Sequence, residues 1–152
     1  MNVTLEPVTI ANFEALMDME LPPEQAGYLA SNAYSIAQAH YYPDWQPRAI
    51  YCDGVPVGFA LYDVEGDGEP GRYAIYRLMV DHPRQQAGIG RRAMLLLLDE
   101  IRTGADARRI TICYRPGNVA AQRFYASLGF VEIGIDGRGE MVAEIALARN
   151  TA

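Results

Sequence analysis

The clearest hydrophobic pattern in the chain runs from residue 89 to residue 103, in the stretch IGRRAMLLLLDEIRT. Apolar residues recur there at helical spacing and form one stripe, made of Ile89, Ala93, Leu96, Leu97 and Ile101. Met94, Leu95 and Leu98 widen this stripe until most of the surface is apolar. The pattern therefore predicts a helix that packs on a sheet and is buried almost all around.

Short β-rich runs and helical segments alternate along the rest of the chain. Strands are expected over residues 3–9, on both sides of Asp53-Gly54 within 48–64, and over 72–81, 108–115, 130–135 and 140–148. Asn12 is the expected N-cap of a helix to about Met19, and a second helix is expected to open at Pro22-Pro23-Glu24 and to end before Pro43. Asn118 and Gly129 bound a last short helix. The order β-α-α-β-β-β-α-β-α-β-β predicts a single mixed α/β domain over residues 1–152.

Charge and composition narrow the function classes. The chain of 152 residues carries a formal net charge of −6, which argues against nucleic acid as the main partner, because phosphate binding needs a basic face. An acidic surface fits a cationic substrate, although it also serves solubility alone. Neither an apolar run of membrane-spanning length nor a signal segment at Met1 is evident, so we expect a soluble cytoplasmic protein without a membrane partner.

The reactive residue types exclude several chemistries. Cys52 and Cys113 each lie inside an apolar run, which predicts two buried structural thiols rather than a disulfide. His40 and His82 match no metal-ligand spacing, so no metal is expected. The chain has no lysine, and this excludes a Schiff base, a pyridoxal-phosphate anchor and a Walker A phosphate loop.

A glycine loop precedes the long helix in the stretch DHPRQQAGIGRR. Gly88 and Gly90 let a ligand approach the helix start, where free N–H groups favour an anion. Arg91 and Arg92 would be unfavourable beside these N–H groups unless a phosphate joins them, or unless both side chains simply reach into water. The glycines also fit a dinucleotide fingerprint, but the intervening loop is long and the next strand does not end in an acid.

Two segments carry a family resemblance. QQAGIG, residues 85–90, and NVAAQRFYASLGF, residues 118–130, resemble the two signatures of the GCN5-related N-acetyltransferases (GNAT), in the family's order. The resemblance implies the GNAT fold, a mixed central β-sheet of about six or seven strands flanked by about four helices, and acetyl-CoA as cosubstrate. The implied cofactor-binding residues are Leu78, Met79, Val80, Gln85, Gln86, Ala87, Gly88, Ile89, Gly90, Arg91, Asn118, Ala121 and Tyr125.

The same resemblance implies the chemistry, which is direct attack of an amine on the thioester in a ternary complex. Tyr125 stands where many relatives carry the tyrosine that protonates the leaving sulfur, although it could instead pack on the sheet beside Phe124. The expected oxyanion donor is the backbone N–H of Met79 or Val80. No acid lies within the preceding strand, YAIYRLMV, so we expect the amine to lose its proton through solvent.

Two further segments bear on the acceptor. The segments ASNAYSIAQA and YYPDW resemble bacterial diamine and polyamine acetyltransferases, which implies a small cationic amine as substrate. The expected substrate-binding residues are Glu20, Glu24, Tyr28, Asn32 and Tyr34. These residues could also be core aromatics and solvated acids. Another acceptor, such as a protein N-terminus, an amino acid or an aminoglycoside, and a non-catalytic CoA sensor stay open, and relatives are often homodimers.

Overall fold

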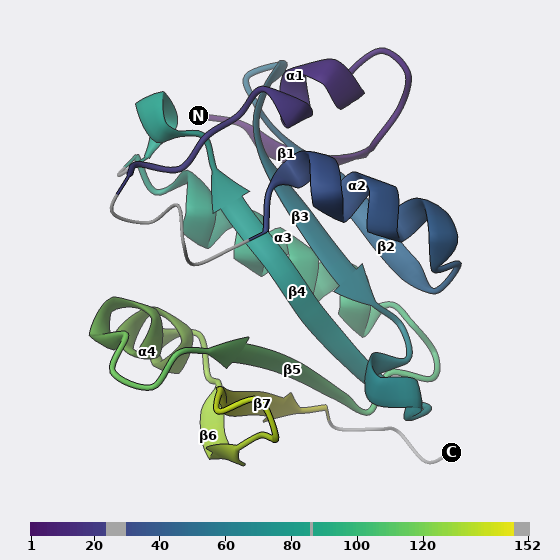
Figure 1. Ribbon diagram of the computed structural model, residues 1–152, viewed down its shortest axis with the longest axis vertical. Helices are drawn as coiled ribbons and strands as arrows, with labels where there is room; N and C mark the ends of the chain where they lie inside the picture. Colours follow the sequence, from purple (N-terminus) through teal and green to yellow (C-terminus); the bar gives the residue numbers. More distant parts are fainter. Residues whose placement is uncertain (24–29, 86, 148–152) are drawn as a thin grey trace.

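Seven strands form one mixed sheet in the order β1-β2-β3-β4-β5-β7-β6 (Figure 1). The computed structural model describes residues 1–23, 30–85 and 87–147. The strands are β1 Val3–Pro7, β2 Trp45–Cys52, β3 Val55–Asp63, β4 Arg72–Val80, β5 Arg109–Tyr114, β6 Val131–Ile135 and β7 Met141–Ala146. All neighbouring pairs are antiparallel except β4 and β5, which are parallel.

Helices cover both faces of the sheet. They are α1 Phe13–Met17, α2 Asn32–Tyr41, α3 Ile89–Arg102 and α4 Val119–Ser127, with two short 3₁₀ turns, η1 Gly66–Gly68 and η2 His82–Arg84. Figure 1 shows α2 in front of β2 and β3, α1 near the upper ends of β1 and β3, and α3 behind β3 and β4. The order of strands and helices and the fold class are those that the sequence predicts, and no described helix is long and apolar enough to cross a membrane.

Two apolar clusters hold these layers together. The larger cluster lies on the α3 face, where Ala93, Leu97 and Ile101 belong to one cluster with residues of β1 to β5 and β7, and α4 adds partly buried aromatics. The smaller cluster lies under α1 and α2 and contains Leu16 and Phe59. Burial of apolar side chains on each face supplies the main driving force for this sandwich of helices around a sheet.

The local signals around turns were accurate. Asp53 and Gly54 both adopt positive φ, 52° and 80°, as a two-residue hairpin turn requires. Gly129 follows α4 with φ of 100°, and the Asn118 side chain accepts a hydrogen bond from the N–H of Ala121. Both ends of α4 are therefore confirmed, as is the hairpin that joins β2 and β3.

Four expectations need correction. The second helix begins at Asn32 with Ser31 as its N-cap, because the Ser31 hydroxyl accepts from the N–H of Tyr34, and Ala30 is not helical. Asn12 precedes α1, but its side chain accepts from Thr9 and leaves the helix uncapped. The structure also exposes 44% of Leu95, so α3 is not buried all around. Cys113 is exposed rather than buried, because it lies on the face of β5 that no helix covers.

Candidate active site

The central feature is the separation of β4 from β5. These strands pair only over the first part of β4, from Arg72–Arg109 to Ile75–Ile112, and then diverge (Figure 1). On the other side, the register with β3 shifts between Leu61 and Tyr62 and leaves Tyr76 as an extra residue, which is a β-bulge. Residues 76–80 therefore present an unpaired backbone edge that is about 13 Å long.

The direction of the backbone groups along this edge follows from two contacts with β3. The N–H of Asp81 donates to the carbonyl of Val57 at 2.8 Å, and the Met79 carbonyl points at Gly58 of β3. Because backbone groups alternate along a strand, those of Leu78 and Val80 face the open edge, whereas those of Met79 face β3. Of the two expected oxyanion donors, the geometry therefore favours the N–H of Val80. The Val80 carbonyl accepts a hydrogen bond from Gln85 Nε2 at 3.0 Å.

The start of α3 lies beside the outer end of the same edge. Gly88 adopts φ of +79°, and no heavy atom lies within 4 Å of the position where a Cβ would stand. The first helical hydrogen bond runs from the N–H of Arg92 to the Gly88 carbonyl, so the preceding amides of the first turn have no acceptor within the helix. Ala87 and Gly88 are exposed, and the helix start is an accessible group of donors. Gln86, a further expected cofactor residue, lies outside the described residues.

Arg91 and Arg92 are both exposed at this helix start. Arg91 Nη1 donates to the hydroxyl of Ser127 at 2.8 Å and so links α3 to α4, and Arg92 Nη1 donates to the Met1 carbonyl at 3.2 Å. Neither arginine forms a salt bridge with a described carboxylate. A pocket of about 720 Å³ adjoins them, lined also by Ala87 and Gly88. An anionic ligand could therefore bind both arginines without breaking a salt bridge to a described residue.

Tyr125 lies on α4 among three other aromatic rings. It stacks on Tyr114 at 5.8 Å between ring centroids and meets Phe124 and Phe130 edge to face. Within the described chain its hydroxyl has no hydrogen-bond partner, and burial raises its pKa above the ordinary value of a tyrosine. The hydroxyl is therefore neutral at physiological pH and has a proton that it can donate.

The sequence-predicted acceptor residues separate into two groups in the structure. A pocket of about 410 Å³, here called the α2 pocket, is lined by Glu20, Asn32 and Met79 among others. The Asn32 side chain has a structural role, because its Nδ2 donates to the Leu16 carbonyl at 2.8 Å and lies 3.5 Å from the Met79 sulfur. Tyr34 is 57% exposed and does not line this pocket. Glu24 and Tyr28 lie outside the described residues.

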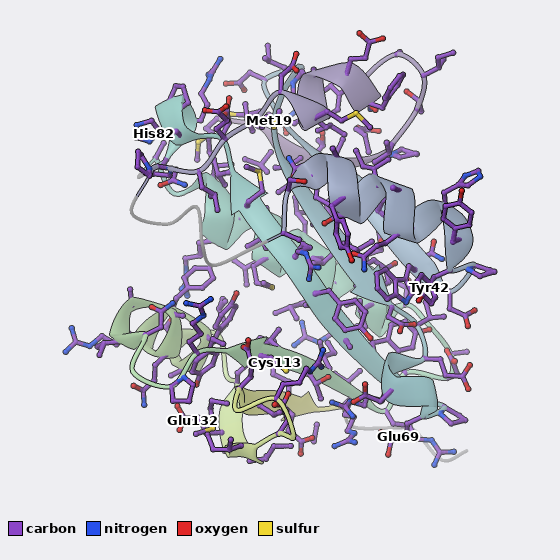
Figure 2. All side chains as sticks on the ribbon, viewed as in Figure 1. Met19, Tyr42, Glu69, His82, Cys113 and Glu132 are labelled. Carbon is purple, nitrogen blue, oxygen red and sulfur yellow. The ribbon has the colours of Figure 1, made fainter. Side chains whose placement is uncertain are left out.

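A second pocket, here called the β4–β5 pocket, lies at the inner end of the open edge and has a volume of about 300 Å³. In Figure 2 the labelled Cys113 marks its position between β4 and the β6–β7 hairpin. Its charged residues come from β4 and from the turns on either side, and they are Asp67, Arg72, Arg77, Asp136, Arg138 and Glu140. None of these residues is among the sequence-predicted site residues, because they come from three separate segments.

Tyr76 at the bulge connects this pocket to a buried carboxylate. Its hydroxyl donates to Asp63 Oδ2 at 2.9 Å, and burial together with this bond raises the pKa of Tyr76. On the outer side its ring contacts Trp45, with 4.9 Å between the ring centroids. Trp45 in turn stacks on Tyr42, with 4.5 Å between the centroids. An aromatic row thus runs from the surface, where Figure 2 labels Tyr42, to the pocket. Such rings suit a cation with methylene groups between its charges.

No metal centre accompanies these groups in the part of the chain that the structure describes. Among residues 1–23, 30–85 and 87–147, no three His, Cys, Asp or Glu side chains are close enough together to hold an ion. The arrangement that remains is a helix start with accessible donors, an open strand edge, a neutral phenol and three pockets. It can hold an extended ligand with an anionic end and bring a second ligand to its other end.

Comparison with known sequences identifies a family and two similar proteins. The sequence profile of the acetyltransferase (GNAT) family matches residues 13–130. A spermine/spermidine N(1)-acetyltransferase of Bacillus subtilis (strain 168) is 28% identical over 155 residues, which cover 95% of this chain and 100% of that protein. An N-alpha-acetyltransferase, RimI, of Mycobacterium tuberculosis is 35% identical over 82 residues, 54% of this chain and 49% of that protein.

Comparison of structures supports the fold. The aminoglycoside acetyltransferase AAC(6′)-Ib in complex with coenzyme A superposes with a TM-score of 0.79 at 19% identity, over 95% of both chains. The PaiA N-acetyltransferase from Thermoplasma acidophilum in complex with coenzyme A gives a TM-score of 0.71 at 17% identity, over 97% of this chain and 100% of that one. At these identities the likeness concerns the fold, and the acceptors named in these relatives differ from one another.

Proposed function

The chain belongs to the acetyltransferase (GNAT) family, and we propose that it transfers the acetyl group of acetyl-CoA to a primary amine of a small polyamine, such as spermidine, spermine or a diamine. The observation that carries this proposal is the open edge of β4, which leads from the start of α3 to the β4–β5 pocket. An extended cosubstrate can lie along this edge, and the acceptor can reach its inner end from the pocket.

Three parts of the chain fit acetyl-CoA. The free amides of Ala87 to Arg91 would hold its diphosphate, and the open space above Gly88 leaves room for this group. The outward-facing backbone groups of Leu78 would bind the pantetheine arm in the manner of an added strand, which leaves the N–H of Val80 for the carbonyl oxygen of the thioester. Bound there, acetyl-CoA supplies an activated thioester. Asn118 and Ala121 serve the site by fixing the start of α4, which carries Tyr125.

The residues of the chain then divide the catalytic work. The Val80 N–H, which faces the open edge, stabilises the negative charge that develops on the carbonyl oxygen. Tyr125 gives its proton to the leaving sulfur, because its hydroxyl is protonated at neutral pH and has no competing partner among the described residues. The amine attacks directly, so neither cysteine acts as a nucleophile, and Cys52 is buried away from the site.

The polyamine acceptor rests on three supports. The relative from Bacillus subtilis, which the chain matches over its whole length, is named a spermine/spermidine acetyltransferase. The row formed by Tyr42, Trp45 and Tyr76 offers ring faces to methylene groups and cations. Carboxylates at the β4–β5 pocket and Glu20 at the α2 pocket can bind ammonium groups.

A panel of amines with thiol release as the readout tests this function. Spermidine, spermine and a diamine should be acetylated with a kcat/KM at least tenfold above those of an aminoglycoside, an amino acid and a peptide with a free N-terminus. Faster transfer to one of the other acceptors, with polyamines inert, would replace the polyamine by that acceptor. Tight binding of acetyl-CoA without transfer to any amine would leave a non-catalytic sensor.

A further inference from the structure

Arg77 is an unusual residue for the wall of a pocket that receives cations. It follows the bulge on β4 and lines the β4–β5 pocket. Its Nη1 donates to the Tyr76 carbonyl at 2.9 Å, whereas its Nε is buried without a hydrogen-bond partner. The partly buried arginines elsewhere in the described chain, Arg48, Arg72 and Arg109, all pair with carboxylates. Arg77 pairs with none.

The surroundings of Arg77 explain why its charge is not neutralised. Burial lowers its pKa, and among the described residues the groups that oppose this effect are the hydroxyls of Tyr34 on α2 and Tyr76 on its own strand. Tyr76 is itself bonded to Asp63 of β3. A guanidinium stays protonated in proteins even when it is partly buried. The pocket wall therefore carries a fixed positive charge next to the inner end of the open edge.

The opposite wall carries negative charge. Asp136, in the turn before β7, accepts backbone hydrogen bonds from Arg138 and Glu140 through Oδ1, and these bonds lower its pKa. Its Oδ2 faces Cys113 of β5 at 3.9 Å and Arg138 at 3.9 Å. Glu140 lies beside it, while Asp67 from η1 is neutralised by Arg72 at 2.9 Å. The pocket thus has a cationic wall at β4 and an anionic wall at the β6–β7 turn.

We propose that this polarity orients the acceptor: Arg77 keeps the nitrogen near β4 neutral and nucleophilic, while Asp136 binds the distal ammonium group. The inference rests on the proposed function and deepens it, because it assigns a residue that prepares the amine in a strand without an acid. A neighbouring cation is an established way to weaken the hold of an amine on its proton. A carboxylate-bearing acceptor fits less well, because Asp136 and Glu140 would repel it.

The proton and electron balance of the step is simple. The ammonium near Arg77 releases one proton to solvent, and the lone pair of the resulting amine forms a C–N bond to the thioester carbon. The carbonyl re-forms as the C–S bond breaks and the sulfur receives a proton from Tyr125. The nitrogen releases its second proton to solvent, and Tyr125 regains a proton from solvent. Two like charges roughly 6 Å apart, at an effective dielectric constant of about 20, lower the pKa of an amine by about two units.

The pH dependence of kcat for spermidine tests the role of Arg77. In Arg77→Met the acid limb of kcat should move upward by about one to two pH units, so that kcat at neutral pH falls about 10- to 100-fold and recovers at high pH. Arg77→Lys keeps the charge and should retain the wild-type limb within about half a unit. Arg102→Met removes one exposed cation at the far end of α3 and serves as the control for net charge. Binding of CoA to each variant reports that the chain is folded.

Two outcomes would overturn the role of Arg77. One is an unmoved acid limb in Arg77→Met with spermidine turnover intact in the wild type. The other is a loss of kcat/KM in Arg77→Met that affects lysine but not cadaverine. Cadaverine differs from lysine only by lacking the carboxylate, so this result would make Arg77 a receptor for a carboxylate. A wild-type enzyme that acetylates no polyamine would instead refute the proposed function, and the acceptor found in its place would be tested with the same variants.

A binding assay tests the anionic wall without turnover. Cys113 is exposed in the pocket, whereas Cys52 is buried, so alkylation by iodoacetamide should label Cys113 first. Putrescine should slow this labelling at least threefold, and butylamine, which lacks the second ammonium, should slow it much less. In Asp136→Asn the difference between the two amines should vanish. Equal protection by both amines in the wild type would refute the assignment of Asp136.

Discussion

Gly88 offers the sharpest test of the cosubstrate site, because a side chain there meets open space in the folded protein. The change we consider is Gly88→Asp, with Gly88→Asn as its control of the same shape and without the charge. Both residues tolerate a positive φ better than other side chains do, so each should cost about 1 kcal/mol of folding stability at the observed φ of +79°. The two variants should therefore be equally stable.

The affinity for CoA should separate them. An aspartate at position 88 would stand at the helix start where the amides hold the diphosphate. Two like unit charges about 4 Å apart repel by about 1–4 kcal/mol between bulk water and an effective dielectric constant of about 20. The Kd of Gly88→Asp should therefore exceed that of Gly88→Asn by a factor between about 5 and about 1000.

Titration calorimetry with CoA at two salt concentrations measures this difference. Because Ala87 and Gly88 are exposed, the gap between the two variants should narrow as salt rises. Thermal unfolding without ligand confirms that both variants fold alike. Equal affinities of the aspartate and asparagine variants for CoA would show that the diphosphate binds elsewhere, and the assignment of Ala87 to Arg91 would be withdrawn.

Three further predictions concern catalysis, packing and titration. Tyr125→Phe should lower kcat about 100-fold and leave the Kd for acetyl-CoA within about threefold, which a thiol-release assay and calorimetry measure together; unchanged turnover would exclude Tyr125 as the acid. Leu97→Ala should cost about 2–5 kcal/mol in urea denaturation and Leu95→Ala less than about 1 kcal/mol, because Leu97 is fully buried and Leu95 is exposed. Burial, together with the bond of Tyr73 to Asp106 and of Tyr114 to Glu132, raises the pKa of both tyrosines to about 12. The two protonated tyrosines should therefore stabilise the fold fully below pH 10, and this stabilisation should be lost as the pH rises through 12. Tyrosinate absorbance would follow the titration.

Local signals in the sequence were sufficient for much of the fold. The Asp53-Gly54 turn, the glycine start of α3 and the Asn118 cap each depend on contacts within a few residues, and each is found as predicted. The second helix shows how two local signals can compete. Pro22-Pro23-Glu24 is a typical helix start, yet the helix begins after Ser31, whose hydroxyl caps it. The segment from Ser31 to Ser35 contained this alternative.

Expectations that depended on the path of neighbouring strands failed. A continuous apolar run predicts an interior strand, and β5 is interior in the sheet, yet its run does not say that β4 leaves it after Ile112. Nor does the run show that the face of β5 with Cys113 carries no helix, which leaves this thiol exposed. Arg77 follows an extra residue in β4, and a bulge that shifts the register by one residue has no signature in a single sequence. The residues of the β4–β5 pocket therefore could not be brought together from sequence alone.

The open edge of β4 beyond the bulge costs free energy in missing backbone hydrogen bonds. Leu78 and Val80 turn backbone groups toward a side where β5 is absent, and a strand left in this state forgoes about 0.5–1.5 kcal/mol for each hydrogen bond that pairing would have made. A ligand with amide groups at a similar spacing can restore these bonds when it binds. Strand pairing is thus missing at one place in the sheet, and Arg77 lines the pocket at the inner end of this gap. An enzyme that must bring two substrates together needs such an opening, and here a single extra residue, Tyr76, lies at its inner end.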